Sequence, residues 1–401
     1  MKYKVLVTKI FQRKKSFIAT ALYQENKLVE VSLESLEQQG ILGNIYVGRV
    51  KDIVKNLNAA FIEIAPGVPC YYSLEDLKNP LYVKKINSPR LVQGDEVVVQ
   101  VVRESSGSKP PKVSTNLNFS GKYLVLTSEN QSLGISKKLN QETREKLRKT
   151  LTFEEDRDYG VIVRTNAAAA SLEEILLEYQ QLKKEYQVIK NTAMHRTVFS
   201  CLKQGIPEYL HAFQSLNPQQ VESILTDDPQ IFQQLQQYFE RLDPKLNDKL
   251  ALYQDQLLSL SKLYSLENRL QEALQERVWL KSGGYLIIQP TEALTVIDVN
   301  SGKSIAKKQA QEHYIKINLE AAEEIAHQIR LRNLSGIIIV DFIDMKEERD
   351  NDKLLKSLRA FVRTDSVPVS VVDMTKLHLV ELTRKKVKKS LAEQMQSGNN
   401  R

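Results

Sequence analysis

Cysteine is scarce in this 401-residue chain. The only two, Cys70 and Cys201, are far apart in the sequence and form no CxxC motif. This excludes a disulfide framework and a cysteine-based zinc site, and it indicates a reducing compartment. Both cysteines are expected to be buried apolar residues.

Long apolar runs are also missing. No stretch approaches the roughly 18 apolar residues of a membrane span, and the opening MKYKVLVTKI has too short an apolar patch for a signal peptide. The sequence therefore predicts no membrane span. Without a targeting segment, the expected compartment is a bacterial cytoplasm or the stroma of a plastid.

An excess of acidic residues is absent as well, because 57 Lys and Arg face 49 Asp and Glu, for a net charge of +8. A basic chain suits a polyanion such as RNA, although a solvated lysine surface gives the same balance. With 42% hydrophobic and 26% charged residues, the chain has the composition of a globular protein. Its length predicts roughly two to four domains.

The first third of the chain has the pattern of β-strands. Residues 1–36 alternate polar and apolar positions in three segments, which predicts a small antiparallel sheet. Between 37 and 120, four apolar segments (NIYVGRVKDIV, AAFIEIA, VPCYYSL and DEVVVQVV) are separated by Gly, Pro and Asn turns. Short strands at this spacing predict a small closed barrel, and the OB-fold is the commonest one that binds oligonucleotides.

The middle of the chain mixes strands and helices. A helix is expected to open at Ser171, because Ser171-Leu-Glu-Glu174 is a capping box. VESILTD predicts a strand, and helices are expected over 228–242 and 263–280, the second ended by Lys281-Ser-Gly-Gly284. Strands and helices then alternate from 285 to about 392, which predicts an α/β layer with parallel pairing, before a polar, frayed tail.

Two aspartates stand at the ends of neighbouring predicted strands. In LTVIDVN, Asp298 and Asn300 project from one face, and Asp341 ends the buried run GIIIVD. The helix between them makes a crossover that places both strands parallel, with their C-terminal ends on one side. At a strand spacing of about 5 Å, the two carboxylates can share one Mg²⁺ that retains its waters, with Asn300 as support.

A purely structural role is the alternative for these aspartates. Aspartates that end strands are often turn or helix-cap residues. Glu292 and Asp344 are nearby acids, but the sequence pattern does not define where their side chains point. Ser301-Gly-Lys-Ser304 follows a strand as a Walker A loop does, but the first glycine of that motif would fall at Ile297. A P-loop NTPase is therefore rejected.

Aromatic and basic residues gather in the predicted barrel. Aromatics there are either core residues or platforms on which unpaired bases stack, and the neighbouring charges favour the platform. The aromatic candidates are Phe61, Tyr71 and Tyr72, and the basic ones are Arg49, Lys51, Lys109 and Lys112.

Several long segments together resemble the catalytic half of the RNase E/G family of bacterial and plastid endoribonucleases. They are GNIYVGRVKDIVKNLNAAFIEI, GISKKL, GVIVRT, SGGYLIIQPTEALTVIDVNSG, NLEAAEEIAHQIRLRNLSGIIIVDFIDM and VELTRKK, in the family's order. The resemblance implies that Asp298 and Asp341 bind catalytic Mg²⁺ with the help of Asn300. It also places Phe61, Tyr71 and Lys109 on the RNA-binding face of the barrel, and Val125, Arg164 and Thr165 in a pocket that senses a 5′-monophosphate.

The family's layout is an α/β multidomain fold. It implies an inactive RNase H-like domain (1–36 plus 216–278) that is interrupted by an S1-type OB-fold barrel (37–120) and a 5′-sensor domain (121–215). A DNase-I-like α/β catalytic domain (279–393) and a tail (394–401) follow.

The chain departs from the family in two places. The family's late VELTRKK helix commonly leads into a CPxC segment that shares zinc between protomers, and no cysteine follows Cys201 here. Pro368 stands near the position of a basic residue that assists the 5′ sensor. The expectation is therefore no cysteine zinc link, an undefined oligomeric state, a weaker 5′-end dependence and no scaffold tail for a degradosome.

The predicted activity is Mg²⁺-dependent endonucleolytic cleavage of single-stranded, A/U-rich RNA to 5′-phosphate and 3′-hydroxyl ends, in RNA processing and mRNA decay. The alternative is a non-catalytic RNA-binding or ribosome-associated protein that retains the fold.

Overall fold

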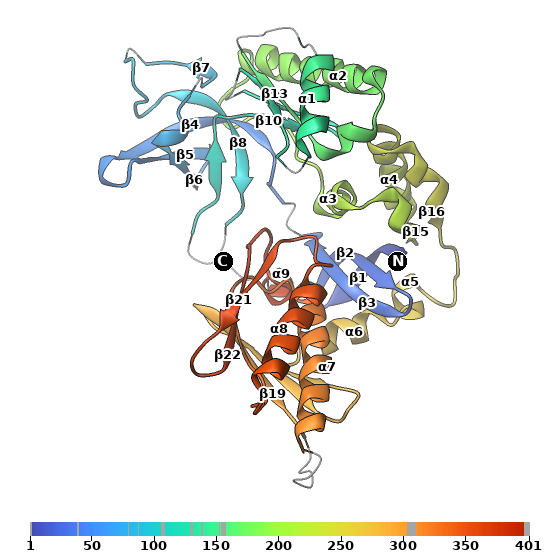
Figure 1. Cartoon of the computed structure of the whole chain (residues 1–401). Helices are drawn as coiled ribbons and strands as arrows, with labels where there is room; N and C mark the ends of the chain where they lie inside the picture. Colours follow the sequence, from blue (N-terminus) through green and yellow to red (C-terminus); the bar gives the residue numbers. More distant parts are fainter. Residues whose placement is uncertain are drawn as a thin grey trace. The chain divides into compact units, whose positions relative to one another are not determined.

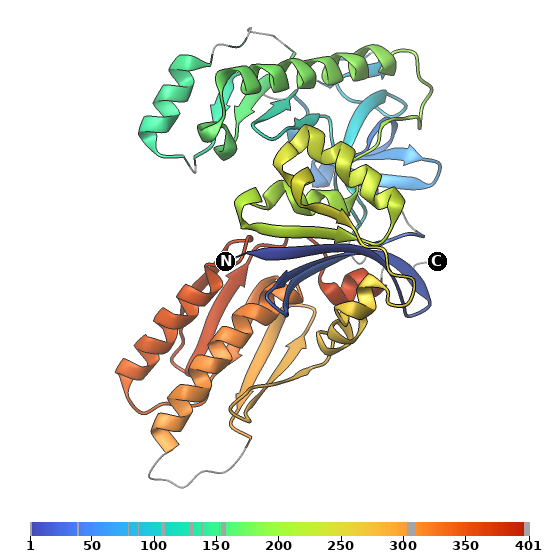
Figure 2. The ribbon, with the colours of Figure 1, turned by 90° about the vertical axis from the view of Figure 1, so that its right-hand side faces the viewer.

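The computed structural model of the chain (Figures 1 and 2) describes residues 2–37, 40–78, 80–86, 88–105, 109–128, 131–137, 139–151, 153, 158–302 and 310–396. The chain divides into two units. The first comprises residues 1–39 and 209–401, and the second comprises residues 40–208.

The first unit contains a five-stranded sheet whose order is β16-β15-β1-β2-β3. As the alternation predicted, β1 (Tyr3–Gln12), β2 (Lys15–Gln24) and β3 (Lys27–Ser35) form an antiparallel meander. β15 (Val221–Thr226) pairs parallel with β1, and β16 (Leu250–Leu252) pairs parallel with β15. The segments before and after the second unit thus share one sheet.

Short helices accompany this sheet. They are α3 (Glu208–Ser215), α4 (Pro229–Leu242), α5 (Leu260–Leu263), α6 (Leu266–Glu272) and α9 (Leu391–Gln396). α4 begins as predicted, because the Asp228 carboxylate accepts hydrogen bonds from two free backbone N–H groups of the first turn. The expectation of a frayed tail over 390–401 is wrong for Leu391–Gln396, because α9 buries Leu391 and Met395 against the core.

The single helix expected over 263–280 is also wrong. Ser265 adopts a left-handed conformation (φ 51°) that separates α5 from α6. The chain then enters β17 (Arg277–Trp279), where the sequence Arg-Val-Trp suits an edge strand. Lys281-Ser-Gly-Gly284 is therefore a turn between two strands and does not end a helix.

The rest of the first unit is a six-stranded sheet with order β17-β18-β19-β20-β22-β21. Its remaining strands are β18 (Tyr285–Pro290), β19 (Leu294–Asn300), β20 (Gly336–Asp341), β21 (Val369–Met374) and β22 (Leu379–Arg384). Helices α7 (Ala310–Leu331) and α8 (Glu348–Val362) share its hydrophobic core (Figure 1).

Parallel pairing, which was predicted for this whole layer, holds only for β19 and β20. The other pairs are antiparallel. Short connections join β17 to β18, β18 to β19 and β21 to β22, and β22 pairs antiparallel with β20 after α8 and β21. The late VELTRKK segment, expected to be helical, instead supplies β22.

The second unit contains the predicted barrel. Strands β4 (Ile45–Val54), β5 (Ala59–Ala65), β6 (Val68–Ser73), β9 (Lys112–Ser114) and β8 (Glu96–Arg103) pair in that order, and β4 also pairs with β8. This closes five strands into a barrel, which confirms the prediction and is compatible with an OB-like domain. β7 (Tyr82–Lys84) and β14 (Cys201–Lys203) extend the sheet.

A four-stranded sheet completes the second unit. Its strands are β10 (Asn118–Ser120), β11 (Leu124–Thr127), β12 (Leu133–Ile135) and β13 (Gly160–Val163), and its helices are α1 (Gln141–Thr150) and α2 (Leu172–Ala193). The capping box at the start of α2 forms as predicted, because Ser171 and Glu174 exchange hydrogen bonds. The 3₁₀ turns of both units are η1 (Lys55–Leu57), η2 (Leu74–Asp76), η3 (Thr165–Ala169), η4 (Pro218–Gln220) and η5 (Pro244–Lys249).

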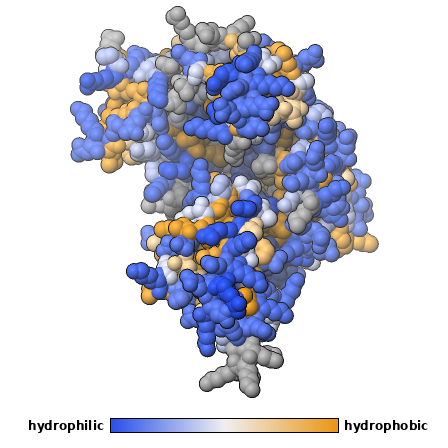
Figure 3. Space-filling view, in the orientation of Figure 1, coloured by the Kyte–Doolittle hydropathy of each residue, from blue (hydrophilic) through white to orange (hydrophobic). Residues whose placement is uncertain are grey.

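Surface features agree with the composition. The visible face in Figure 3 is mostly hydrophilic, with smaller hydrophobic areas. Within the described residues, no helix combines the length and hydropathy needed to cross a bilayer. Cys70 is buried, but the expectation that Cys201 is buried too is wrong, because it lies exposed on β14.

A polar cluster ties β3 to α7 in the first unit. His327 places Nδ1 2.9 Å from Glu324 Oε1 and Nε2 2.7 Å from the Leu28 carbonyl oxygen. Lys27 also donates to Glu324, at 2.9 Å. Burial alone would raise the pKa of Glu324, but the hydrogen bond and charge of His327, helped by Gln328 and Lys27, lower it to about 2.

This cluster makes the stability of the first unit sensitive to acid. Because the pKa of Glu324 is lowered on folding, its contribution is complete above the ordinary value of 4.5 and is lost as pH falls towards 2. At about 1.4 kcal/mol for each pKa unit, we expect a loss of up to about 3 kcal/mol. Denaturant unfolding of wild-type protein and Glu324→Gln at several pH values measures it. Parallel pH curves for the two proteins would contradict the assignment.

Candidate functional site

Two carboxylates meet at the C-terminal ends of the parallel pair of strands. Asp298 on β19 is the direct register partner of Asp341 on β20, so the predicted convergence is present. Asn300 lies two residues further along β19 and donates a hydrogen bond from Nδ2 to Asp298 Oδ2, at 2.7 Å. These three residues form what we call the carboxylate row.

Local sequence explains why the row faces away from the core. Along β19, Thr295, Ile297 and Val299 are buried, while the alternate positions are more exposed. Strand side chains alternate between faces, so the apolar residues pack with α7 and α8 and leave Asp298 and Asn300 on the open face. The same parity puts Asp341 there, opposite Ile338 and Val340.

Asn318 is a residue of the site that the sequence analysis missed. It is fully buried on α7 and exchanges two hydrogen bonds with the backbone of Ile343, donating to its carbonyl at 2.8 Å and accepting from its N–H at 3.1 Å. These bonds fix the segment that follows Asp341. A polar residue on the apolar side of a helical pattern was the available signal.

Glycines hold the end of β19 against the turn between β17 and β18. A Cβ atom on Gly284 would lie 2.7 Å from the Asn300 carbonyl oxygen, and one on Gly302 would lie 2.2 Å from the Gly283 carbonyl oxygen. Gly302 also has a φ of 74°, in the left-handed region. Only glycine permits this close approach, which positions Asn300.

The electrostatics of the row favour a bound cation. Partial burial raises the pKa of Asp341, and the negative charges of Asp298 and Asp344 raise it further. A divalent cation between the carboxylates would relieve this repulsion. Across the described residues there is no group of three or more Asp, Glu, His or Cys placed to hold a metal, so the protein would supply two carboxylates and water the rest. That donor set fits Mg²⁺, which keeps several waters.

The other candidates near the row differ in position. Asp344 is close enough to raise the pKa of Asp341. Glu292 lies in the turn between β18 and β19. The first residue of β19, Leu294, is already about 13 Å from Asp298 at 3.3 Å per residue, so the expectation that Glu292 lies near the site is wrong. Lys303 and Ser304 of the rejected Walker motif lie outside the described residues.

The barrel brings together two of its predicted aromatic residues. Phe61 on β5 and Tyr71 on β6 are register partners, with ring centroids 6.4 Å apart at 80°. Both are partly exposed. Tyr72 is not available for stacking, because it points to the opposite face, is fully buried and hydrogen-bonds Thr115 at 3.0 Å.

The predicted lysine and arginine residues of the barrel are at least partly exposed. Lys109 is exposed, and Lys112 is the register partner of Tyr71 and lies 3.0 Å from Asp76. Arg49 and Lys51 pair with Glu96 and Glu63 across the barrel surface. Exposed pairs of this kind contribute little stability, so these cations remain available to a polyanion.

The predicted phosphate sensor occupies neighbouring strands. Val125 on β11 pairs with Ile162 on β13, and Arg164 follows β13 on the same face. Arg164 donates from Nη1 to the Gly121 carbonyl at 2.5 Å, and Thr165 begins η3. The structure therefore brings Val125 and Arg164 to one sheet face, with Thr165 next in the chain.

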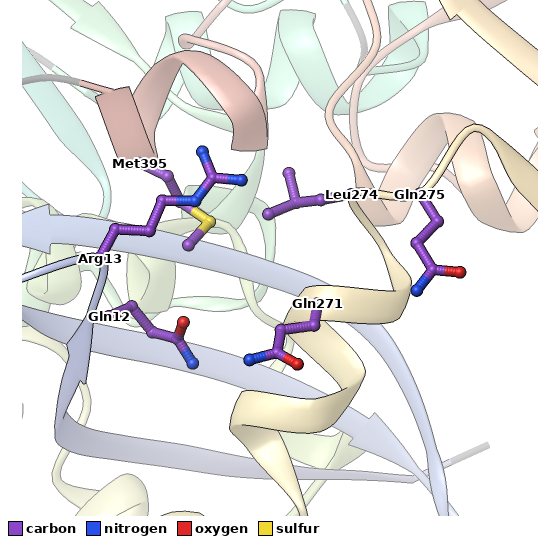
Figure 4. Close-up of a pocket in the computed structure, with 6 residues that line it drawn as sticks. All are labelled: Gln12, Arg13, Gln271, Leu274, Gln275 and Met395. Carbon is purple, nitrogen blue, oxygen red and sulfur yellow. The ribbon is translucent and has the colours of Figure 1, made fainter.

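A separate pocket of about 350 Å³ lies elsewhere in the first unit (Figure 4). Its lining residues come from the β1–β2 turn, α6 with the segment that follows it, and α9, and none belongs to β19 or β20. They are Gln12, Arg13, Gln271, Leu274, Gln275 and Met395.

Comparison with known proteins gives a consistent result. The profile of the Ribonuclease E/G family matches residues 118–387. The chain is 34% identical over 386 residues to ribonuclease G of Haemophilus influenzae, covering 92% of this chain and 78% of that protein. It is 30% identical to ribonuclease G of Escherichia coli K12, with 91% and 76% covered. Against ribonuclease E of Synechocystis, identity is 32% and the chain spans 56% of that protein.

Proposed function

The chain belongs to the ribonuclease E/G family and is therefore an endoribonuclease, and from this premise we propose that it cleaves single-stranded RNA with Mg²⁺ held by Asp298 and Asp341. The observation that carries the proposal is the register pairing of these two carboxylates on an open sheet face. Repulsion between two neighbouring carboxylates lowers stability unless a cation neutralises it. Such a pair is therefore typical of a functional site.

Each residue of the site has a proposed role. Asp298 and Asp341 hold the metal, and Asn300 fixes the orientation of the Asp298 carboxylate through their 2.7 Å hydrogen bond. Asn318 holds the segment after Asp341. When bound, Mg²⁺ supplies a water of lowered pKa and positive charge near the phosphoryl oxygens. The proposed products carry 5′-phosphate and 3′-hydroxyl ends.

The second unit supplies the proposed RNA contacts. Phe61 and Tyr71 stack unpaired bases, and Lys109 binds the phosphate backbone. Val125, Arg164 and Thr165 recognise a 5′-monophosphate, for which an arginine fork and a hydroxyl are suitable donors. A preference for A/U-rich sequence and a role in RNA processing and mRNA decay complete the proposal. A bacterial cytoplasm or a plastid stroma remains the expected compartment.

The domain assignment is also proposed on the family's layout. The five-stranded sheet would be the inactive RNase H-like domain, the barrel the S1-type domain, the four-stranded sheet with α2 the 5′ sensor, and the six-stranded sheet with α7 and α8 the DNase-I-like catalytic domain. The pairing of β1 with β15 supports the first of these.

Metal removal tests the proposed function directly. Purified protein should cut a 5′-monophosphorylated, A/U-rich oligonucleotide in the presence of Mg²⁺, because water bound to the metal is the proposed nucleophile. EDTA should abolish cleavage, and excess Mg²⁺ should restore it. Product ends are identified by their reaction with a 5′-phosphate-dependent exonuclease. RNA binding without cleavage would favour the non-catalytic alternative, whereas cleavage that persists in EDTA would exclude the metal.

A further inference from the structure

Beside the carboxylate row, the open face of the same sheet carries an aromatic and guanidinium cluster. Trp279 on β17 is the register partner of Tyr285 on β18, and Tyr285 is the register partner of Asn300 on β19. Arg277 on β17 is in register with Ile287 on β18, and through it with Asp298 and Asp341. Trp279, Tyr285 and Arg277 thus lie in register with the carboxylate row on one sheet.

Parity places the cluster on the open face. Leu286 and Ile288 alternate with Tyr285 and Ile287 along β18 and are fully buried in the core with α7 and α8. Val278 packs against that core as well, so its neighbours on β17, Arg277 and Trp279, project to the opposite side. At inter-strand spacings of about 4.8 Å, Trp279 lies about 10 Å from Asn300.

The cluster is ordered yet exposed. The Trp279 and Tyr285 ring centroids are 5.3 Å apart at 61°. The Arg277 guanidinium carbon lies 5.6 Å from the Trp279 centroid and 4.6 Å from the Tyr285 centroid. Nevertheless Trp279 remains 64% exposed, and within the described part of the chain no carboxylate pairs with Arg277. A large indole held in place but left in solvent is unusual for a residue that serves only packing.

We propose that Trp279, Tyr285 and Arg277 form a stacking platform for an unpaired base of the RNA substrate next to the phosphate that is cleaved. This inference rests on the proposed function. An exposed indole offers a π-face that accepts any base, and a guanidinium can bind the adjacent phosphate. The placement in register with Asp298, Asp341 and Asn300 would hold the nucleotide chain across the carboxylate row.

The chain offers a direct probe of this platform, because Trp279 is its only tryptophan. Wild-type protein is titrated in EDTA with a single-stranded A/U-rich RNA, and Trp279 fluorescence is recorded in parallel with the anisotropy of a dye on the RNA. Stacking predicts fluorescence quenching with the same midpoint as the anisotropy change. Anisotropy that rises while the fluorescence stays constant would overturn the proposal.

Substitutions give the second measurement. Trp279→Ala should lower kcat/KM for RNA cleavage about tenfold, mainly by raising KM. The loss of one stacked base weakens binding by about this factor. Trp279→Phe should stay within about threefold of wild type, since it keeps an aromatic face. Phe11→Ala removes a similarly exposed aromatic (68% exposed) from β1 and serves as the matched control. Equal kinetics for Trp279→Ala and wild type would overturn the platform.

The outcomes separate this inference from the function on which it rests. If the wild-type protein does not cleave RNA with Mg²⁺, the proposed function fails. If it cleaves normally but shows no quenching and no effect of Trp279→Ala, only the platform fails. Fluorescence that changes with protein concentration instead of RNA concentration would identify this face as a contact between copies of the chain and would overturn the proposal.

Discussion

Replacing Asp341 with asparagine should lower the rate of RNA cleavage by about three orders of magnitude or more. The substitution keeps the size of the side chain but removes half of the negative charge that would hold the metal, and a metal contributes several kcal/mol to charge stabilisation in the transition state. Asp298→Asn should have a similar effect, because Asp298 is the register partner of Asp341. Single-turnover cleavage with saturating enzyme measures the chemical step.

Two controls separate catalysis from binding and folding. Glu292→Gln likewise removes one negative charge, but in the turn between β18 and β19, at the opposite end of β19 from Asp298. It should leave the cleavage rate unchanged. Tyr71→Ala should weaken RNA binding while the single-turnover rate at saturating enzyme is retained. Wild-type activity in either aspartate variant would show that the carboxylate row does not bind the catalytic metal.

Replacing Asp365 with alanine should destabilise the first unit by about 3–5 kcal/mol, because this leaves a buried guanidinium without its counter-charge. Asp365 and Arg384 form a two-pronged ion pair with N–O distances of 2.8 and 3.2 Å, and their side chains are only 4% and 3% exposed. Arg384 also donates to Asn333 Oδ1 at 2.6 Å and to the Leu334 carbonyl at 3.1 Å. Denaturant unfolding measures the loss.

The matched control lies two residues beyond Arg384. Lys386 forms an ion pair with Glu393 in which the side chains are 51% and 41% exposed. Lys386→Ala should therefore cost less than about 1 kcal/mol, as expected for a surface pair. If Asp365→Ala costs no more than Lys386→Ala, the buried pair does not anchor β22.

The carboxylate row could be predicted because its determinants are local. Alternation fixed the faces of Asp298 and Asn300, and a single helix between two apolar strands required a parallel crossover. The barrel followed from strand length and turn spacing in the same way. Tyr71 and Tyr72 were both candidates for stacking, although adjacent residues of a strand point to opposite faces. Which face is the core depends on the closed barrel.

Features that rest on contacts distant in sequence were not predictable. β22 forms where a helix was expected, because the segment pairs with β20 and β21 in the folded unit. The edge strand β17, which replaces the end of the expected helix, depends on pairing with β18. Asn318 acquires its role only when Ile343 lies beside α7. Local propensity carries no information on such partners.

The α7 crossover between β19 and β20 also has a consequence during translation. The ribosome delivers Asp298 first, and the second carboxylate follows only after the whole of α7 has been made. A growing chain that ends before Asp341 therefore lacks one of the two carboxylates that we propose to hold Mg²⁺.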